Sequence, residues 1–368
     1  MKFTVDRGLF LDAVSKLQKV VSLKTSMPVL EGILISAENG LLTLSAYNLE
    51  MGMKKEMYAK CDEEGDIVIN ARLLSEILRK LNGIQVDIEV DERLMCFIKC
   101  GESTFDIMGM AASDFPEMPS VADGTKIKIE GSVFCDMVKG TGFAVSQIEG
   151  TRPILTGINI SVKDEILQFV AIDGYRLAIR RQKVSEIENI EFTASGKAIN
   201  EVVKLVDENV ENIDILVGKR LISFNIGGYL FISRLLEGEF VNYEKIIPSE
   251  FKQKMTVNCH DLIESVDRVS LLINDIFSTP IRCTLSEDNL MINCVTSLGR
   301  AKENVKISLE GEEFEIGLNS RYLNEALKAC DDGNILFKLN GSNSGVVIIS
   351  ANEENNDFLY LIMPMRLK

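Results

Sequence analysis

The residue types able to carry out chemistry are few and scattered. The chain of 368 residues has one histidine, His260, so multi-histidine metal sites are excluded and a single imidazole remains for acid–base catalysis. The eight cysteines contain no C-x-x-C pair. This pattern predicts reduced, buried thiols. A zinc site built from Cys259, His260, Cys283 and Cys294 is the less favoured interpretation.

Motifs typical of enzymes are weak. Asp87 and Glu89 lie at strand spacing on one face of an alternating segment, which allows an acid pair, although a solvated strand face is the preferred interpretation. The segment GTGFAV from Gly140 has two glycines of a dinucleotide-binding fingerprint but Val145 in place of the third. Neither a Walker sequence nor G-x-S-x-G occurs. An enzyme made of three modules, a hydrolase or transferase that uses an acid pair, therefore stays an alternative to a protein that acts by binding. A structural scaffold that binds no nucleic acid is a third possibility.

The composition is that of an ordinary globular protein. Lys and Arg number 40 against 55 Asp and Glu, which gives a net charge of −15, and 46% of the residues are hydrophobic. A surface that is basic all round is excluded, so any nucleic-acid site must be local. The N-terminus lacks the apolar stretch of a signal peptide, and no uncharged apolar run approaches the length of a membrane span. We therefore expect a cytoplasmic protein.

The elements that must position these residues form an internal repeat. Three helix-like segments share a small or polar first residue, a cation two residues later and apolar residues at helical spacing; they begin at Asn70, Ser195 and Asn319. The cations Arg72, Lys197 and Arg321 recur at intervals of 125 and 124 residues, and a glutamate follows each of them four residues later.

A second set of similar segments precedes these helices. PVLEGILIS from Pro28 and PILTGINIS from Pro153 are identical at six of nine positions, and a weaker copy begins at Pro280. Each unit reads strand, helix, strands, helix, strands, which predicts an α+β fold repeated three times. The predicted domains span residues 1–120, 127–248 and 254–368.

Similar domains joined through similar surfaces form an arc, and three such units could close alone or as half of a ring of six. The predicted helices carry a net charge of +3, so the rest of the chain carries −18. This distribution fits helices that face a polyanion, although on charge alone solvated helix faces with paired Glu and Lys are the preferred interpretation. The helices are predicted at residues 8–22, 71–82, 132–146, 196–206, 260–274 and 320–330.

Two further segments stand out. AIDGYRLAIR, from Ala171, predicts a strand, an Asp-Gly turn and a second strand. The C-terminal segment FLYLIMPMRLK is largely apolar, and leaving it in water would be costly. We therefore expect this segment to pack against the protein or to form a binding surface.

The whole chain resembles the β sliding clamp family of bacterial DNA polymerase III. The resemblance rests on the threefold repeat and on four motifs: MKFTVDR at the start, SDFPEMP at 113–119, DGYRLA at 173–178 and YLIMPMRL at 360–367. It implies the DNA clamp fold, a head-to-tail homodimer of six domains in which helices line a ring and sheets lie outside. It also implies that the chain is no enzyme and needs no cofactor or metal.

The resemblance further implies the partners. Such a clamp encircles duplex DNA without reading its sequence. It holds the DNA polymerase III alpha subunit and other proteins with a clamp-binding motif through one peptide pocket per subunit, and a clamp loader opens it with ATP. The matching pocket residues are Leu155, Ile172, Gly174, Tyr175, Arg176, Leu177, Val241, Lys245, Ile246, Met363, Pro364, Met365 and Arg366.

Departures from the family pattern affect the preference for partners. Val241 stands where relatives can carry proline, Lys245 where they can carry arginine, and Ile172 where they can carry threonine. Pro153 replaces an aromatic residue beside a loop that matches a DNA-contacting loop. The DNA-binding positions implied by the resemblance are Lys24, Arg72, Gln147, Arg152 and Lys197. It also implies that the dimer contact joins the first domain of one chain to the third domain of the other. The candidates for this contact are Phe105 and Ile107, which alternate on a predicted strand, and Leu271 and Leu272, which end a predicted helix.

Overall fold

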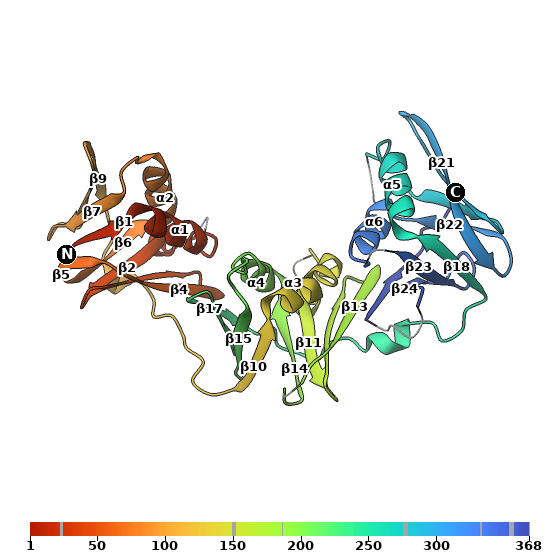
Figure 1. Ribbon diagram of the computed structural model, residues 1–368, viewed down its shortest axis with the longest axis horizontal. Coiled ribbons are helices and arrows are strands. Elements are labelled where there is room, and N and C mark those ends of the chain that lie inside the picture. The colour runs from red at the N-terminus through yellow and green to blue at the C-terminus, as the bar shows by residue number, and fades with distance from the viewer. Residues whose placement is uncertain are drawn as a thin grey trace. The chain divides into compact units, whose positions relative to one another are not determined.

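A computed structural model of the chain describes residues 1–22, 25–148, 152–185, 187–274, 279–331, 333–352 and 357–367 (Figure 1). Its contacts form two compact units. The first unit comprises residues 1–132 and 197–235, and the second comprises residues 133–196 and 236–368. The division runs through the middle copy of the repeat, because each half of that copy extends the sheet of a neighbouring copy. The three predicted domains stay a prediction.

Six α-helices occur in the described residues, two for each predicted copy. Four of them have an Asp or Asn N-cap whose side chain accepts a hydrogen bond from a backbone N–H of the first turn, namely Asp6, Asn70, Asn258 and Asn319. The cap therefore fixes where each of these helices begins. The helices are α1 (Arg7–Leu17), α2 (Ala71–Lys80), α3 (Gly131–Lys139), α4 (Gly196–Val203), α5 (Cys259–Ser270) and α6 (Ser320–Lys328).

Helix ends differ from the prediction, and the predicted helices 8–22 and 132–146 are too long. Beyond Leu17 the chain tightens, because Val20 N–H donates to the Leu17 carbonyl three residues back at 3.0 Å. Beyond Lys139, the Thr141 hydroxyl donates to the Met137 carbonyl at 2.8 Å, and a short 3₁₀ helix, η3 (Gly142–Ala144), replaces the α-helix. The segment GTGFAV therefore lies past the end of α3 and contains η3.

The first unit contains two sheets. The strand order of the smaller is β5-β1-β7-β8-β9, and that of the larger is β10-β15-β16-β17-β4-β3-β2-β6. The strands of the first sheet are β1 (Lys2–Asp6), β5 (Lys60–Glu63), β7 (Gln85–Val90), β8 (Met95–Cys100) and β9 (Ser103–Met108). Those of the second are β2 (Gly32–Glu38), β3 (Leu41–Tyr47), β4 (Met51–Tyr58), β6 (Gly65–Asn70), β10 (Thr125–Glu130), β15 (Asn212–Val217), β16 (Leu221–Ile226) and β17 (Tyr229–Arg234).

The second unit is built on one sheet of order β14-β11-β12-β13-β25-β24-β23-β18-β21-β20-β19-β22. Its first strands are β11 (Gly157–Lys163), β12 (Ile166–Ile172), β13 (Arg176–Lys183) and β14 (Ile190–Ser195). The others are β18 (Gln253–Asn258), β19 (Ile281–Leu285), β20 (Asn289–Thr296), β21 (Gly299–Glu310), β22 (Phe314–Leu318), β23 (Asn334–Leu339), β24 (Val346–Ser350) and β25 (Phe358–Ile362).

Short 3₁₀ helices occupy equivalent places in the repeat. Pro28 begins η1 (Pro28–Glu31) and Pro153 begins η4 (Pro153–Thr156). Proline suits a first helical position, since its fixed φ is helical and its missing N–H has no partner to lose there. The remaining 3₁₀ segments are η2 (Ala112–Asp114) and η5 (Tyr243–Ile246).

Antiparallel pairing carries each sheet from one copy of the repeat into the next. In the first unit β4 pairs with β17, and Lys55 lies opposite Tyr229. In the second unit β13 pairs with β25, and Arg180 lies opposite Phe358. These residues hold equivalent positions in the repeat, so the two joints have the same register.

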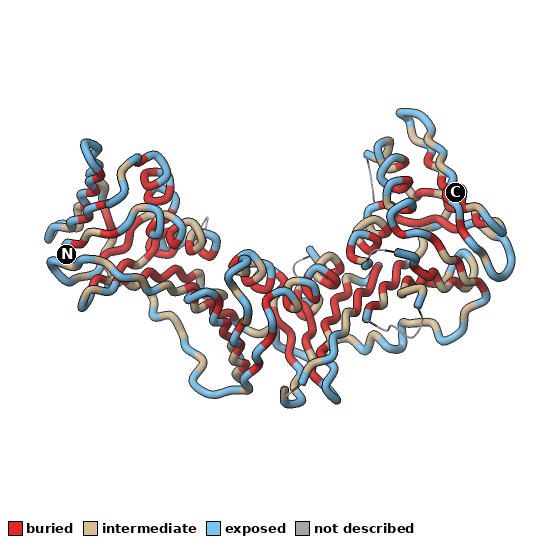
Figure 2. Tube along the Cα trace, in the orientation of Figure 1, coloured by how far each residue is buried: buried red, intermediate tan, exposed pale blue. Residues whose placement is uncertain are grey.

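The cores lie between the sheets and the helices that cover them (Figure 2). Phe3 and Phe10 meet edge to face at 6.3 Å in the first unit, and Phe134 and Phe169 do so at 5.9 Å in the second. Aromatic pairs of this geometry add to the free energy gained from burial. None of the described helices combines the length and the apolar character needed to cross a membrane.

Candidate functional site

The predicted Asp-Gly turn joins β12 to β13 and is organised by one carboxylate. Asp173 Oδ1 accepts hydrogen bonds from the backbone N–H of Tyr175 at 2.9 Å and of Arg176 at 3.0 Å. Gly174 adopts a φ of +92°, a left-handed conformation that glycine reaches without a steric penalty. The turn thereby leaves Tyr175 exposed and buries Arg176.

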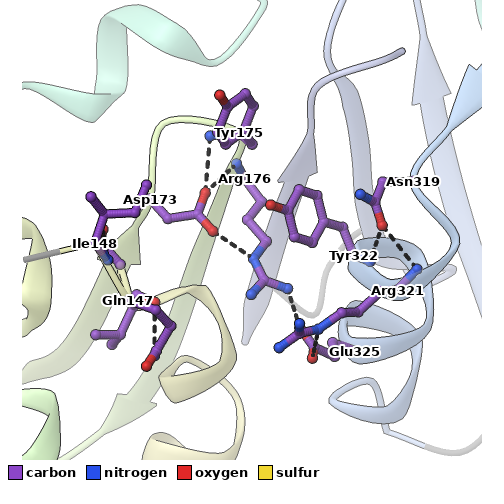
Figure 3. A network of polar contacts seen from close by, with 11 residues as sticks. Gln147, Ile148, Asp173, Tyr175, Arg176, Asn319, Arg321, Tyr322 and Glu325 are labelled. Atoms are coloured by element: carbon purple, nitrogen blue, oxygen red, sulfur yellow. Dashed lines mark hydrogen bonds and ion pairs between the residues drawn. The ribbon is translucent and has the colours of Figure 1, made fainter. Parts of the chain in front are cut away.

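The guanidinium of Arg176 is the centre of a polar network (Figure 3). Its Nε donates to Asp173 Oδ2 at 2.9 Å, and its Nη1 donates to Glu325 Oε2. The guanidinium carbon lies 4.3 Å from the ring centre of Tyr322 and 5.4 Å from that of Phe143. Arg176 is 5% exposed, so this charge is held by one carboxylate from the turn, one from α6 and two aromatic rings.

Glu325 also binds a second arginine. Its Oε1 accepts a hydrogen bond from Arg321 Nε at 2.8 Å, while its Oε2 accepts the bond from Arg176. Burial works against the ionised carboxylate, but the hydrogen bonds from Arg321 and Arg176 outweigh it, and the pKa of Glu325 is lowered. Asn319 caps α6 by accepting the N–H groups of Arg321 and Tyr322, which fixes the first turn of this helix beside the Asp-Gly turn.

Tyr175 and the C-terminal segment meet beside this network. The ring of Tyr175 stacks on that of Tyr322, with the centres 6.3 Å apart and the planes at 29°. The Met363 N–H donates to the Tyr175 carbonyl, and the Met365 N–H donates to the Gly317 carbonyl, both at 2.8 Å. A Cβ at Gly317 would lie 2.5 Å from the Met365 carbonyl oxygen, so only glycine permits this approach. The C-terminal segment is thus pinned at two points.

An apolar cluster lies under the turn. It joins strands β12, β13, β24 and β25, and partly buried side chains from the loop after residue 239 pack against it. Its buried members are Val170, Ile172, Leu177, Ile179, Val347 and Leu361, and its partly buried members include Leu155, Phe240, Tyr243, Ile247 and Phe251. Because the partly buried side chains keep a solvent-facing edge, this cluster forms an apolar part of the protein surface.

A hollow of about 780 Å³ runs along the C-terminal segment. Four residues of the predicted pocket line it, namely Met363, Pro364, Met365 and Arg366. Arg282 and Glu315 line the same hollow and pair with each other at 2.6 Å. The lining mixes apolar side chains with polar and charged ones, among them Ser342 and Asn343. Such a surface suits an extended peptide that carries both apolar anchors and polar groups.

The predicted pocket residues fall into three groups: those in or against the apolar cluster, those outside it, and those of the Asp-Gly turn and the C-terminal segment. Ile172 and Leu177 are buried in the apolar cluster, and Leu155 packs against it. Val241 is half-buried and Lys245 is exposed. Neither they nor Ile246, which is 40% exposed, are among the residues of the cluster. The predicted turn and C-terminal residues meet as described above.

Sequence reasoning missed several residues of this region. Ile247, next to the predicted Ile246, packs on the cluster, and Tyr243 accepts a hydrogen bond from Gln168 Nε2 at 2.7 Å. Their signal was present as apolar and aromatic residues spaced through an otherwise polar loop. Tyr322 and Glu325 carried no such signal, because their role depends on an arginine about 150 residues away.

Four of the residues predicted to touch DNA lie on or beside helices. Arg72 is an exposed residue of α2 and pairs with Glu76 at 2.9 Å, and Lys197 is an exposed residue of α4. Gln147 and Arg152 are exposed, close to η3 and η4 respectively. Lys24 lies outside the described residues. A phosphate would have to compete with Glu76 for Arg72, which makes such a contact weak.

The residues predicted to form the dimer contact lie at element edges. Phe105 and Ile107 belong to β9, an edge strand of its sheet, and Phe105 is 37% exposed. Leu271, directly after α5, is 81% exposed, and Leu272 beside it is half-buried. Exposed apolar residues on an open strand edge are a feature of surfaces that pair with another chain.

The candidate enzyme residues show no catalytic arrangement. Asp87 accepts a hydrogen bond from the Thr4 hydroxyl at 2.6 Å, and Glu89 pairs with Lys2 at 2.7 Å, all on an exposed sheet face. The cysteines are free thiols, and no cluster of His, Cys, Asp and Glu suited to a metal occurs among the described residues. Burial raises the pKa of the Cys283 thiol to about 12. An acid-pair enzyme therefore gains no support.

The sequence matches three family descriptions in order along the chain. Residues 1–119 match "DNA polymerase III beta subunit, N-terminal domain", residues 128–242 match its central domain, and residues 244–366 match its C-terminal domain. The "Beta sliding clamp" of Halalkalibacterium halodurans is 32% identical over 383 residues, and the alignment covers 100% of both chains.

Solved structures agree with these matches. The DNA polymerase sliding clamp of Bacillus subtilis aligns with a TM-score of 0.94 at 28% identity, and that of Pseudomonas aeruginosa, solved with a ligand, aligns with a TM-score of 0.91 at 29% identity. Both alignments cover 100% of each chain. The chain, with three repeats of the clamp fold, belongs to the DNA polymerase III beta subunit family, the beta sliding clamps.

Proposed function

We propose that two copies of this chain close head to tail into a ring around duplex DNA and hold the replicative polymerase and repair proteins to it. Family membership over the full length supports this proposal. The observation that carries it is the repeated sheet joint. The first and second repeats are joined by one strand pairing, and the second and third repeats are joined by the equivalent pairing. In each unit, one further strand that could form this pairing has an unpaired edge.

The repeat predicts the register of the strand pairing between two subunits. In both joints within the chain, the strand that follows the hairpin turn of one copy pairs with the last strand of the next copy. The equivalent strands without such a partner are β9 of the first copy and the first half of β21 in the third. Among the described residues, β21 pairs with β20 along Gly299–Lys306 and with β18 only along Ile307–Glu310. The other side of its first half is therefore available.

Transfer of the register places complementary side chains opposite each other. Phe105 of one subunit falls opposite Ala301 of the other subunit, and Asp106 falls opposite Arg300. Asp106 and Arg300 are both exposed in the single chain. Directly opposite residues of opposite charge favour antiparallel pairing, and an aromatic residue facing a small one leaves room for its ring. A twofold dimer would contain this joint twice.

The helices provide the contacts to DNA in this proposal. Arg72 and Lys197 are exposed near the first turn of α2 and α4, and Arg321 has the same place on α6. Such residues contact phosphates and do not read bases. Each contact is weak and depends on salt, which suits a protein that must slide. A closed ring retains DNA by topology, so high affinity is unnecessary.

The partner site is the region between the Asp-Gly turn and the C-terminal segment. Its apolar cluster and the hollow along Met363 to Arg366 suit a short extended peptide with bulky apolar anchors. Met363 and Met365 are flexible enough to adapt to several partners. We propose the DNA polymerase III alpha subunit, the clamp loader and other proteins with a clamp-binding motif as these partners.

The proposal assigns no chemical step to the chain. It requires no cofactor, the ATP needed to open the ring is used by the clamp loader, and the protein works in the cytoplasm beside the DNA.

Topology provides the decisive experiment. The clamp is loaded by its loader onto a nicked circular plasmid, washed at high salt and then exposed to a restriction enzyme that cuts once. We expect the clamp to stay on the circle and to leave after linearisation. Equal retention before and after the cut would overturn the ring.

A further inference from the structure

Glu325 connects two regions that have different tasks in the proposed function. One of its carboxylate oxygens binds Arg176, which is buried behind the Asp-Gly turn of the peptide pocket. The other binds Arg321, a half-exposed residue at the start of α6. In Figure 3, dashed lines join Glu325 to both arginines, and the ring of Tyr322 lies beside Arg176.

We propose that Glu325 is a positioning residue of the peptide pocket that acts through Arg176, and that Arg321 weakens this action by sharing the carboxylate. This inference rests on the proposed function. Loss of Glu325 should loosen the pocket, whereas removal of Arg321 should tighten it. A phosphate group that draws Arg321 away from Glu325 should therefore favour peptide binding.

The first half of the proposal follows from the burial of Arg176. Its Nε is already bonded to Asp173, and its Nη1 is directed to Glu325. A buried charged donor that loses its partner is costly, so without Glu325 the guanidinium must move to find another. Any such movement pulls on Asp173, whose other oxygen holds the N–H groups of Tyr175 and Arg176. The exposed ring of Tyr175 would then lose its fixed place.

The second half follows from the sharing of one negative charge. A carboxylate that balances two cations attracts each less strongly than it would attract one alone. Arg321 is about half exposed and can reach solvent or a phosphate, while Arg176 cannot leave its buried place. When Arg321 departs, the bond from Arg176 to Glu325 should strengthen. A more rigid turn costs less entropy when a peptide binds.

The repeat supplies a built-in comparison. Glu76 is the equivalent of Glu325 in the first copy, and it pairs with Arg72 at 2.9 Å as Glu325 pairs with Arg321. The position equivalent to Arg176 is Met51 in the first copy and Gly299 in the third. Of the three equivalent positions, only that of Arg176 is an arginine that can add a second cation to the glutamate. This position belongs to the joint that carries the pocket.

Three variants test the proposal in the full-length protein: Glu325→Gln, Arg321→Gln and the matched control Glu76→Gln. The probe is a fluorescent peptide from the C-terminus of the DNA polymerase III alpha subunit of the same organism, measured by anisotropy. We expect Glu325→Gln to weaken binding about fivefold. Arg321→Gln should tighten it about twofold, and Glu76→Gln should leave it unchanged. A fourth variant that combines Glu325→Gln with Arg321→Gln should bind the peptide like Glu325→Gln alone, because Arg321 acts through Glu325.

Amide hydrogen exchange separates a local effect from a loss of stability. In Glu325→Gln the exchange rates of the Tyr175 and Arg176 amides should rise by a larger factor than those of amides in the central strands, which report the loss of global stability. Unchanged affinity and exchange in this variant would overturn the proposal, as would uniformly faster exchange. Weaker binding by Arg321→Gln would overturn the role of Arg321. If the wild type fails to bind the peptide, the proposed pocket is wrong, and exchange at the turn still tests Glu325.

Discussion

Arg180 Nη2 donates to both carboxylate oxygens of Asp331, at 2.9 and 3.2 Å, and so ties β13 to the segment after α6. The Arg180 guanidinium also lies 5.7 Å from the ring centre of Phe358 on the paired strand. At the equivalent place in the other joint, Lys55 lies 4.4 Å from the ring centre of Tyr229. Both joints within the chain therefore set a cation from one copy against an aromatic ring of the next.

The predicted dimer joint lacks this contact. The equivalent positions are Glu303 and Ser103, and Glu303 is already bound by Arg268 at 2.9 Å. If the three joints share one register, the joint between subunits lacks a cation–ring contact that both joints within the chain have. A ring that must open for DNA to enter would part there, and the covalently linked joints would stay closed.

The Arg180–Asp331 pair should contribute to the stability of the second unit. Arg180 is largely buried, and removal of its partner by Asp331→Asn should cost about 1–2 kcal/mol of unfolding free energy. For a unit of this size we expect the melting temperature to fall by about 2–8 °C. Asp136→Asn, which neutralises an exposed aspartate of α3, is the matched control and should leave the melting temperature unchanged. Equal melting temperatures for both variants would contradict the assigned role.

Charge exchange should test the register of the dimer joint. Asp106→Arg places two arginines opposite each other in each of the two joints of the ring, and we expect the dimer to weaken about tenfold or more. Arg300→Asp should have the same effect, and the double variant should recover the dimer because it restores opposite charges. Sedimentation equilibrium gives the dissociation constants. Failure of the double variant to recover would mean that the two residues do not face each other.

Sequence reasoning located the starts of elements better than their ends. Asn70 and Asn319 mark helix starts because a side-chain cap is a local interaction, legible within four residues. The Asp-Gly turn was legible for the same reason. The end of α3 was not, because Gly140 sits where its backbone approaches the side chain of Arg180, which belongs to a distant strand. The burial of Arg176 depends in the same way on a helix that begins at Ser320.

Reversal of charge on the helices should reduce contact with DNA. We expect Arg72→Glu with Lys197→Glu to weaken direct binding to duplex DNA and to reduce the slope of log K against log salt by about 0.9 for each lost phosphate contact. Lys126 and Lys128 are exposed on strand β10, and their change to glutamate alters the net charge equally. A fluorescence titration at several salt concentrations measures both pairs. Equal effects of the two pairs would show that net charge alone is responsible.

The Glu325 carboxylate should give stability that depends on pH. Its pKa is lowered in the folded protein. Its contribution is therefore fully present above the ordinary carboxyl pKa and is lost as the pH falls through the lowered value. The difference in melting temperature between the wild type and Glu325→Gln should be present at neutral pH and shrink as the pH falls below that ordinary value. Calorimetry measures the melting temperatures, and a constant difference across this range would show that the ionised form of Glu325 is not what stabilises the fold.

The last prediction concerns Met365, which lines the hollow along the C-terminal segment. Its backbone N–H is bonded to the Gly317 carbonyl, so the side chain can be shortened without loss of the bond that holds the segment. Met365→Ala should therefore weaken binding of the polymerase peptide by about 2 kcal/mol, roughly thirtyfold, and leave the melting temperature close to that of the wild type.

Leu177 is the informative contrast to Met365. Leu177 is 1% exposed within the apolar cluster, so Leu177→Ala should destabilise the second unit by about 2–5 kcal/mol and impair peptide binding through the fold. Anisotropy and calorimetry on both variants separate the two cases. If Met365→Ala lowers affinity and melting temperature together, its side chain is part of the core. If affinity stays within about twofold while the fold is intact, the peptide binds elsewhere on the chain.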